Sequence, residues 1–126
     1  MATVVLDTSV LIALFKADDS HHASAVKATS AKNEYLISAV TLSEALIAAF
    51  RISQQAGRKQ EQLITRSMNR VISIDEEIAM HGAQIRAEKN LSLPDALISA
   101  TAYKSKAQLW SCDRELVKAH KGAVQI

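Results

Sequence analysis

The sequence predicts an α/β fold in which helices cover both faces of a mostly parallel sheet of roughly five strands. Short apolar runs alternate along the chain with longer amphipathic segments, a pattern typical of βα units joined by right-handed crossovers. The 126 residues, 48% of them hydrophobic, are enough for one core, so we expect residues 1–126 to form a single domain. The expected architecture is a three-layer α/β/α arrangement.

The first half of the chain contains two expected strands. The apolar runs TVVL and YLI indicate buried strands, and apolar residues at helical spacing indicate helices between and after them. Glycine commonly follows the last residue of a helix, so Gly57 indicates a helix end. In order we expect a strand at 3–6, helices at about 9–16 and 20–30, a loop at 31–34, a strand at 35–37, a helix at 41–56 ended by Gly57, a loop at 57–60 and a polar helical segment at 59–69.

The second half repeats the alternation. RVISI and QLWS are apolar runs that indicate strands, and Pro94 is suited to the first turn of a helix. In order we expect a strand at 70–74, a helix at about 76–89, a helix opening around Pro94, a loop at 104–107, a strand at 108–111, a short helix at 114–120 and a closing strand at 122–126.

Composition narrows the cellular setting. Cys112 is the single cysteine, which excludes an internal disulfide and favours a reducing, cytoplasmic location. The apolar N-terminus contains Asp7, has no basic leader and is shorter than the about 20 residues of a membrane span, so we expect neither a signal peptide nor a membrane anchor. Setting four acids aside leaves nine acids against 15 Lys and Arg, a balance of +6 that suits a polyanionic partner.

Four acids stand where strands lead into helices: Asp7, Glu44, Asp95 and Asp113. Each has a structural explanation. The pairs Thr41–Glu44 and Ser92–Asp95 fit a capping box, and Asp7 and Asp113 suit N-caps. Considered one at a time, capping is the commoner role for such acids.

Considered together, the four acids favour a metal site. Carboxyl ends of strands in an open parallel sheet converge on one crevice, where acids after the first and fourth strands would meet. Carboxylates gathered there repel one another unless a cation neutralises them, and hard oxygen ligands favour Mg²⁺ or Mn²⁺. Such a site suits phosphodiester hydrolysis. Asp75 has an equivalent strand-to-helix position, and the pattern alone does not exclude it.

The motifs VVLDTSVLIAL, TLSEAL, LSLPDALISATA and LWSCDREL, in this order, resemble the four acidic motifs of PIN-domain ribonucleases, particularly VapC-type toxins of toxin–antitoxin pairs. The resemblance runs from Val4 to about Leu116, with the first and third motifs the more specific. The fourth departs from the family's usual form, because Leu116 stands where an aromatic residue is common.

The resemblance implies site residues and chemistry. Asp7, Glu44, Asp95 and Asp113 match the metal-binding, catalytic acids of the family. Ser9 matches a residue that orients the first acid, Ser111 supplies the hydroxyl two positions before the last acid, and Asp75 matches no metal position. The implied activity is cleavage of RNA with Mg²⁺, or Mn²⁺ in its place. The implied partners are RNA, a cognate antitoxin and a second copy in a homodimer, without a membrane.

Three alternatives remain at this stage. A phosphoacceptor receiver domain has a similar length, but it places paired acids after its first strand, where Asp7 stands alone. A PIN fold that serves only as a binding or dimerisation module is a second alternative. A nuclease directed at DNA is the third, and competition between substrates separates it from a ribonuclease.

Other polar residues have simpler explanations. We expect all four histidines on the solvated surface, Trp110 in the core, and Arg86 as a neighbour of the site. No His and Cys spacing resembles a zinc site. Two basic groups are able to follow an RNA backbone; they comprise Arg51, Arg58, Lys59, Arg66 and Arg70 in the first, and Lys104, Lys106, Arg114, Lys118 and Lys121 in the second.

Overall fold

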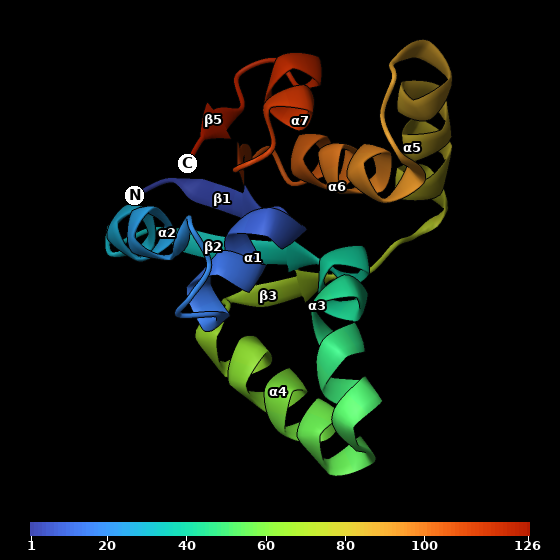
Figure 1. Ribbon diagram of the computed structural model, residues 1–126. Helices are drawn as coiled ribbons and strands as arrows, with labels where there is room; N and C mark the ends of the chain where they lie inside the picture. Colours follow the sequence, from blue (N-terminus) through green and yellow to red (C-terminus); the bar gives the residue numbers. More distant parts are fainter.

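Five strands form one sheet, and seven helices lie against it (Figure 1). The computed structural model describes all residues, Met1–Ile126. In chain order the elements are β1 (Thr3–Leu6), α1 (Thr8–Phe15), α2 (His22–Thr29), β2 (Glu34–Ser38), α3 (Ala39–Ile52), α4 (Gln54–Ser67), β3 (Arg70–Ile72), α5 (Glu76–Glu88), α6 (Leu93–Lys104), β4 (Gln108–Ser111), α7 (Arg114–Ala119) and β5 (Val124–Gln125). The predicted five-stranded α/β fold is confirmed.

The order of the strands decides where a site can form. The sheet runs β3-β2-β1-β4-β5, and every neighbouring pair is parallel. β2 and then β3 lie on one side of β1, and β4 and then β5 lie on the other. The order in which strands are added to the sheet therefore reverses between β1 and β4. Leu6 lies opposite Trp110 in this central pair. The crevice of an open α/β sheet therefore opens beyond the carboxyl ends of β1 and β4.

The two faces of the sheet bury separate hydrophobic cores. Val5 packs with residues of α5, α6 and α7, whereas Val4 and Leu6 pack with residues of α1, α2 and α4. The alternation follows from the two-residue period of a strand, and it gives the three predicted layers. Trp110 is buried as expected, and its ring meets the edge of Tyr35 at 5.8 Å between centroids. The helices are all too short or too polar to cross a membrane.

The predicted helix at 41–56 is wrong at both ends. The helix α3 begins at Ala39, capped by Ser38, and ends at Ile52. Ser53 is extended, with φ −170°, and its hydroxyl oxygen accepts a hydrogen bond from Ala56 N at 3.0 Å, which starts α4. A serine able to cap a new helix therefore ended the first one before Gly57.

Gly57 lies inside α4 and ends no helix, and the loop expected at 57–60 is helical. The ring of Phe50 rests directly on this glycine, since a Cβ atom at position 57 would lie 2.2 Å from Phe50 Cδ1. The missing side chain lets α3 and α4 approach closely and form a hairpin, which projects below the sheet in Figure 1. Close helix packing, and not a turn, accounts for this glycine.

His120 is buried, with 3% of its surface exposed, so its expected place on the surface is wrong. Its Nδ1 lies 2.6 Å from Ser99 Oγ, and its ring stacks on Tyr103 at 4.2 Å between centroids. Burial, with added repulsion from Lys89 and His81, lowers the pKa of His120 to about 4. The end of α7 packs against α6, and that long-range contact is invisible in the local sequence.

Candidate active site

Asp7 lies at the centre of the site, at the end of β1, and is 3% exposed. Its Oδ1 accepts hydrogen bonds from Val10 N at 3.1 Å and from Ser9 Oγ at 2.6 Å. Its Oδ2 accepts one from Ser111 Oγ at 2.5 Å. The first bond is the predicted N-cap of α1, and the two serine bonds are additional. Asp7 is thus held in one orientation from both sides.

Ser9 and Ser111, the two serines expected beside the first acid, also connect β1 to the turn after β4. Ser9 Oγ accepts a hydrogen bond from Cys112 N at 3.0 Å, and Ser111 Oγ accepts one from Asp113 N at 2.9 Å. Each serine therefore donates to Asp7 and accepts from the turn that carries Asp113. This arrangement fixes the position of the first and last acids relative to each other.

Glu44 reaches the site from α3, and it does not cap that helix. Because α3 is capped by Ser38, Thr41 and Glu44 both lie within the helix, and the expected capping box there is wrong. Glu44 Oε1 instead accepts a hydrogen bond of 2.6 Å from Thr8 Oγ1, and the Thr8 and Thr41 hydroxyl groups are hydrogen-bonded at 3.2 Å. Sequence reasoning missed Thr8, although it directly follows Asp7.

Asp95 and Asp113 stand at the N-termini of α6 and α7. Ser92 caps α6, and its Oγ accepts from Asp95 N at 3.3 Å, so this half of the expected capping box is present. Asp113 caps α7 as predicted, accepting from Glu115 N at 2.9 Å. Asp95 is half-buried and Asp113 is exposed, which leaves both carboxylates accessible from solvent.

Electrostatic coupling shows that the four acids share one region. Burial raises the pKa of Asp7 despite its three hydrogen bonds, with a further contribution from Asp113. Burial also raises the pKa of Asp95, followed by repulsion from Asp113, Asp7 and Glu44. The charges of Asp113, Asp7 and Glu44 all act on Asp95, so the four carboxylates form a region of unfavourable negative charge. A divalent cation would relieve it.

The chemistry of the donors fits a hard divalent ion, since all four side chains offer carboxylate oxygens. As they stand, no three acidic, histidine or cysteine side chains converge tightly enough to enclose one ion. Metal binding would therefore need the side chains to turn inward. Asp7 is held by both serines and Glu44 by Thr8, so Asp95 and Asp113 are the less constrained acids.

Asp75 and Arg86 lie outside this cluster. Asp75 caps α5 by accepting from Ile78 N at 2.9 Å, and Lys104 pairs with its carboxylate and lowers its pKa. Arg86 does not contact an acid; its Nη1 donates to the backbone oxygen of Leu91 at 2.5 Å and holds the turn before α6. The expected site role of Arg86 has no support from these contacts.

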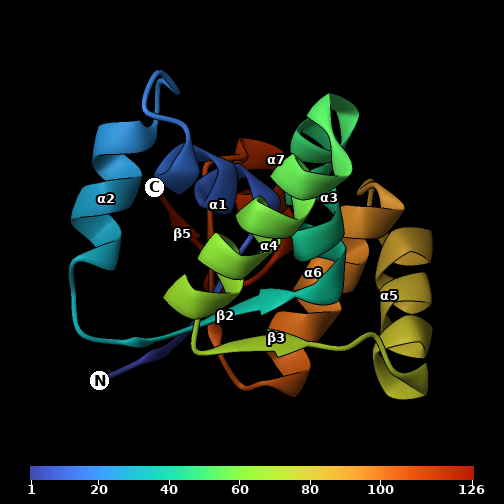
Figure 2. The same cartoon turned by 90° about the horizontal axis from the view of Figure 1, so that it is seen from below.

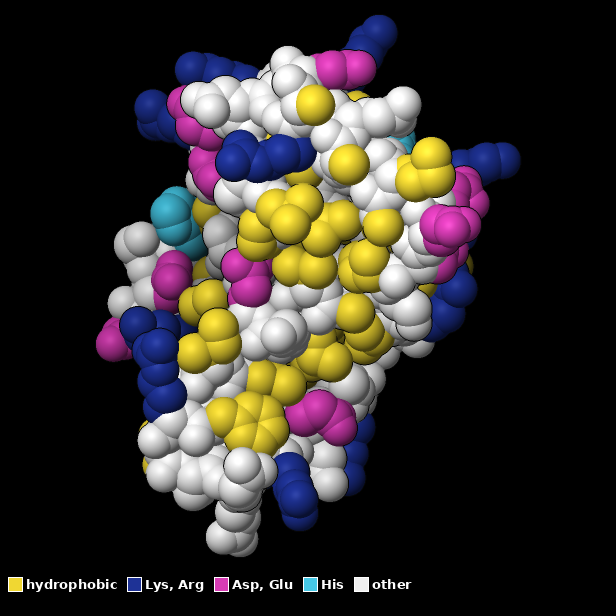
Figure 3. Space-filling model, turned by 90° about the vertical axis from the view of Figure 1, so that its right-hand side faces the viewer, with side chains coloured by type: hydrophobic (Ala, Val, Ile, Leu, Met, Phe, Trp, Pro, Cys, Tyr) yellow, Lys and Arg dark blue, Asp and Glu magenta, His cyan; other side chains and the backbone are white.

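An apolar groove of about 440 Å³ begins at Glu44 and runs between α1, α3 and α4. Its lining includes Leu11, Phe15, Ala49 and Ile52. Figure 3 shows the face toward which β1, β2 and β3 point, where hydrophobic side chains gather over the middle and acidic side chains lie beside them. The site thus combines an acidic centre with an apolar border.

A family model for the PIN domain matches residues 4–122. The chain belongs to the PIN domain family. The match covers all four acidic motifs, and the predicted family is confirmed. The receiver-domain alternative is excluded, because that fold has strand order 2-1-3-4-5, which differs from the order found in this PIN domain.

Solved structures similar to this PIN domain include components of toxin–antitoxin systems. VapC20 from Mycobacterium tuberculosis, described as a toxin that cleaves the sarcin-ricin loop, has a TM-score of 0.78 at 23% identity, with 98% of each chain covered. FitAcB from Neisseria gonorrhoeae scores 0.77 at 22% identity, covering 98% of this chain and 96% of that one. A toxin–antitoxin complex from Klebsiella pneumoniae scores 0.74 at 27% identity, covering 98% and 99%. No curated protein sequence matches this chain.

Proposed function

We propose that the protein is a VapC-like toxin, a metal-dependent endoribonuclease that hydrolyses phosphodiester bonds of RNA. The observation that carries the proposal is the buried Asp7 carboxylate, oriented by Ser9 and Ser111, in a region where Asp95 is also repelled by Asp113 and Glu44. Membership of the PIN domain family and the RNA cleavage attributed to VapC20 support it. The proposed compartment is the cytoplasm.

In this proposal Asp7, Glu44, Asp95 and Asp113 hold Mg²⁺, for which Mn²⁺ is an alternative. The ion, when bound, supplies Lewis-acid chemistry that makes water a better nucleophile and offsets charge on the phosphate. Asp7 stays fixed by its serines, and a neighbouring carboxylate with a raised pKa, Asp95, accepts a proton from the attacking water. The water oxygen bonds to phosphorus as the bond to the 3′ oxygen breaks, and the 3′ oxygen takes up a proton from solvent, leaving a 5′-phosphate and a 3′-hydroxyl group.

We also propose that a cognate antitoxin occupies the apolar groove. An amphipathic segment would place its hydrophobic side chains against Phe15, Ala49 and Ile52, and a basic side chain at its end would reach Glu44. Such a cation would compete with the metal for the carboxylates. The toxin–antitoxin complex from Klebsiella pneumoniae supports a partner of this kind. A homodimer is part of the same proposal.

The decisive experiment is cleavage of a panel of structured RNAs with Mg²⁺ or Mn²⁺. Wild-type protein, wild type with a chelator, and Asp95→Asn are compared, with Asp75→Asn as the matched control outside the cluster. We expect cuts with wild type and Asp75→Asn that disappear with chelator and with Asp95→Asn. Asparagine is close to aspartate in shape and leaves the Ser92 cap of α6 in place, so we expect this variant to fold.

Three results would overturn the proposal. Cleavage that survives both the chelator and Asp95→Asn would show that the acids are not the reactive centre. Folded wild type that binds metal but cleaves no RNA on the panel would favour a PIN fold acting as a binding or dimerisation module. Preferential cleavage of DNA in a mixed sample would assign the activity to the other nucleic acid.

A further inference from the structure

The outward face of α4 carries a stripe of basic and amide side chains. We call Gln55, Arg58, Lys59, Gln62 and Arg66 the outer stripe; all five are exposed. At 100° per residue they fall within an arc of about 100°, opposite the buried Gly57 and Ile64. The stripe therefore has three cations and two amides and no acid. Every one of its side chains can donate hydrogen bonds to phosphate oxygens.

The cations of the outer stripe have no acidic partner in the protein. None of Arg58, Lys59 and Arg66 forms a salt bridge, and the one acid of α4, Glu61, is hydrogen-bonded to Thr65. Pairing is mixed among the other cations. Arg70 pairs with Glu34, Lys104 with Asp75 and Glu77, and Lys118 with Glu115, whereas Lys106, Arg114 and Lys121 form no salt bridge. The outer stripe is distinguished by three unpaired cations on one face of a single helix.

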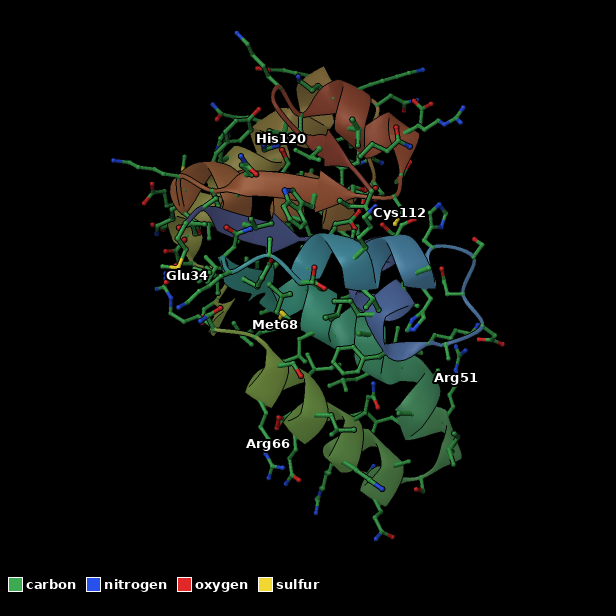
Figure 4. All side chains as sticks on the ribbon, turned by 90° about the vertical axis from the view of Figure 1, so that its left-hand side faces the viewer. Glu34, Arg51, Arg66, Met68, Cys112 and His120 are labelled. Atoms are coloured by element: carbon green, nitrogen blue, oxygen red, sulfur yellow. The ribbon has the colours of Figure 1, made fainter.

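The surface at the first half of the stripe is hollowed. A depression of about 490 Å³ is lined by Gln54, Gln55, Arg58, Lys59 and Gln62, with no hydrophobic residue among them. Figure 4 shows Arg66 at the other end of α4, extending away from the body of the protein. A polar, concave surface with unpaired cations suits a chain of phosphates better than a hydrophobic protein segment.

The outer stripe remains available when the apolar groove is filled. Gln60 and Ile64 line the groove, whereas helical spacing places the stripe on the opposite side of α4. Seen from below, α4 lies in front of α1 (Figure 2). Along α3, Arg51 lies seven residues beyond Glu44, a rise of about 10 Å, and α4 begins just after it. Exposed Arg51 thus lies between Glu44 and the start of α4 along the hairpin, and it forms no salt bridge.

We propose that the outer stripe is an RNA-docking surface that grips the phosphate backbone beside the cleavage point. The proposal rests on the proposed ribonuclease function and names the surface that holds the substrate. Arg58 and Arg66 are eight residues apart, so they present cations about 12 Å apart along one helix edge. Contacts of this kind recognise shape and phosphate position and carry no base sequence.

The test measures binding and not cleavage. Asp95→Asn protein in the presence of a chelator is titrated into a fluorescently labelled RNA hairpin, and the affinity is followed by anisotropy across a range of salt concentrations. The stripe variant adds Arg58→Gln, Lys59→Gln and Arg66→Gln. The matched control adds Lys106→Gln, Lys118→Gln and Lys121→Gln, which removes the same charge elsewhere. Gln is a good helix former, and circular dichroism checks that the helices persist.

We expect the stripe variant to bind the RNA at least about tenfold more weakly at low salt. The slope of log affinity against log salt concentration should also be smaller in magnitude by about two units, because each lost phosphate contact removes about 0.7 to 0.9 from that slope. The control should flatten by less than about one unit. Equal losses in the two variants would overturn the proposal, since only overall charge would matter. A DNA duplex that displaces the hairpin as well as unlabelled RNA does would overturn the assignment to RNA.

A failure here is distinguishable from failure of the proposed function. If wild type cleaves RNA but the stripe variant binds normally, the nuclease stands and the docking surface is wrong. If wild type fails to cleave while stripe-dependent RNA binding is present, the docking surface stands and the catalytic proposal is wrong.

Discussion

At the scale of single residues, one carboxylate can cap a helix and still serve a site. Asp7 accepts the Val10 N–H of α1 while both of its oxygens also take serine hydroxyl groups. A carboxylate has about four positions for accepting hydrogen bonds, so a single cap leaves capacity for other partners. Burial still raises the pKa of Asp7, which means that the hydrogen bonds orient the group without fully compensating for lost solvent.

Thr8→Val tests how Glu44 is positioned. Valine keeps the shape of threonine but cannot donate the 2.6 Å hydrogen bond to Glu44 Oε1. We expect divalent metal affinity to fall by about tenfold, since residues that orient a ligand commonly contribute that much. Calorimetric titration with Mn²⁺ measures it. Thr8→Ser should restore most of the affinity, and equal affinities for Thr8→Val and wild type would show that this bond does not position Glu44.

His120→Gln tests whether the buried histidine makes the stability of the fold depend on pH. The pKa of about 4 in the folded protein lies below the ordinary 6.5, so unfolded chains bind more protons between these values. This residue therefore stabilises the fold above pH 6.5, and its contribution, up to about 3 kcal/mol, is lost as pH falls toward 4.

Urea unfolding at several pH values measures this effect as the difference between wild type and His120→Gln. That difference should shrink as pH falls, because glutamine does not titrate. His21→Gln, at an exposed position, is the control and should follow wild type. A constant difference between pH 7 and pH 4 would contradict the expectation.

At the scale of elements, the α3–α4 hairpin depends on Ser53. This residue ends α3 through its backbone and starts α4 through its side chain, so two helices meet with only one residue between them. The close contact of Phe50 with Gly57 then holds the two helices together. The hairpin forms one wall of the apolar groove and carries the outer stripe, so its geometry affects both proposed surfaces.

Ser53→Ala should destabilise the protein by about 1 kcal/mol, because Ala56 N loses its capping acceptor. Chemical unfolding measures the change in the free energy of unfolding. Ser43→Ala, at an exposed position within α3, is the control and should be neutral or slightly stabilising, since alanine favours a helix interior. A loss no greater for Ser53→Ala than for Ser43→Ala would show that the cap does not stabilise the hairpin.

At the scale of the whole molecule, the proposed metal site would couple metal binding to stability. Its carboxylates come from the ends of β1 and β4 and from α3 and α6, so they assemble only in the folded chain. Millimolar Mn²⁺ should raise the melting temperature by several degrees, because a ligand that binds only the folded state stabilises it by about 2.7 kcal/mol at a hundredfold excess over Kd. Differential scanning fluorimetry measures the shift.

The same shift should be smaller at pH 5 than at pH 8. The raised pKa values of Asp7 and Asp95 mean that protons compete with the metal at the lower pH. Asp95→Asn should lose most of the shift, and Asp75→Asn should keep it. An equal shift in both variants would place the ion elsewhere.

Much of the fold was predictable because its signals are local. The apolar runs at TVVL and QLWS, the helix opening at Pro94 and the cap at Asp113 depend on neighbours within a few residues, and all were placed correctly. The alternation of strands and helices then gave the three layers. Local signals failed where two were in competition, as at Ser53 and Gly57, since either residue type can end a helix.

The sequence by itself determined the fold class and the family, because periodicity, helix caps and short motifs are written in consecutive residues. It also predicted the four acids as site residues. Tertiary structure decided what the acids contact. Only the pairing of β1 with β4 brings Ser111 to Asp7, and only the packing of α3 brings Glu44 to Thr8. Tertiary structure likewise decided that His120 is buried and that the cations of α4 have no acidic partner. Such contacts join residues far apart in the chain, where no local pattern records the partner.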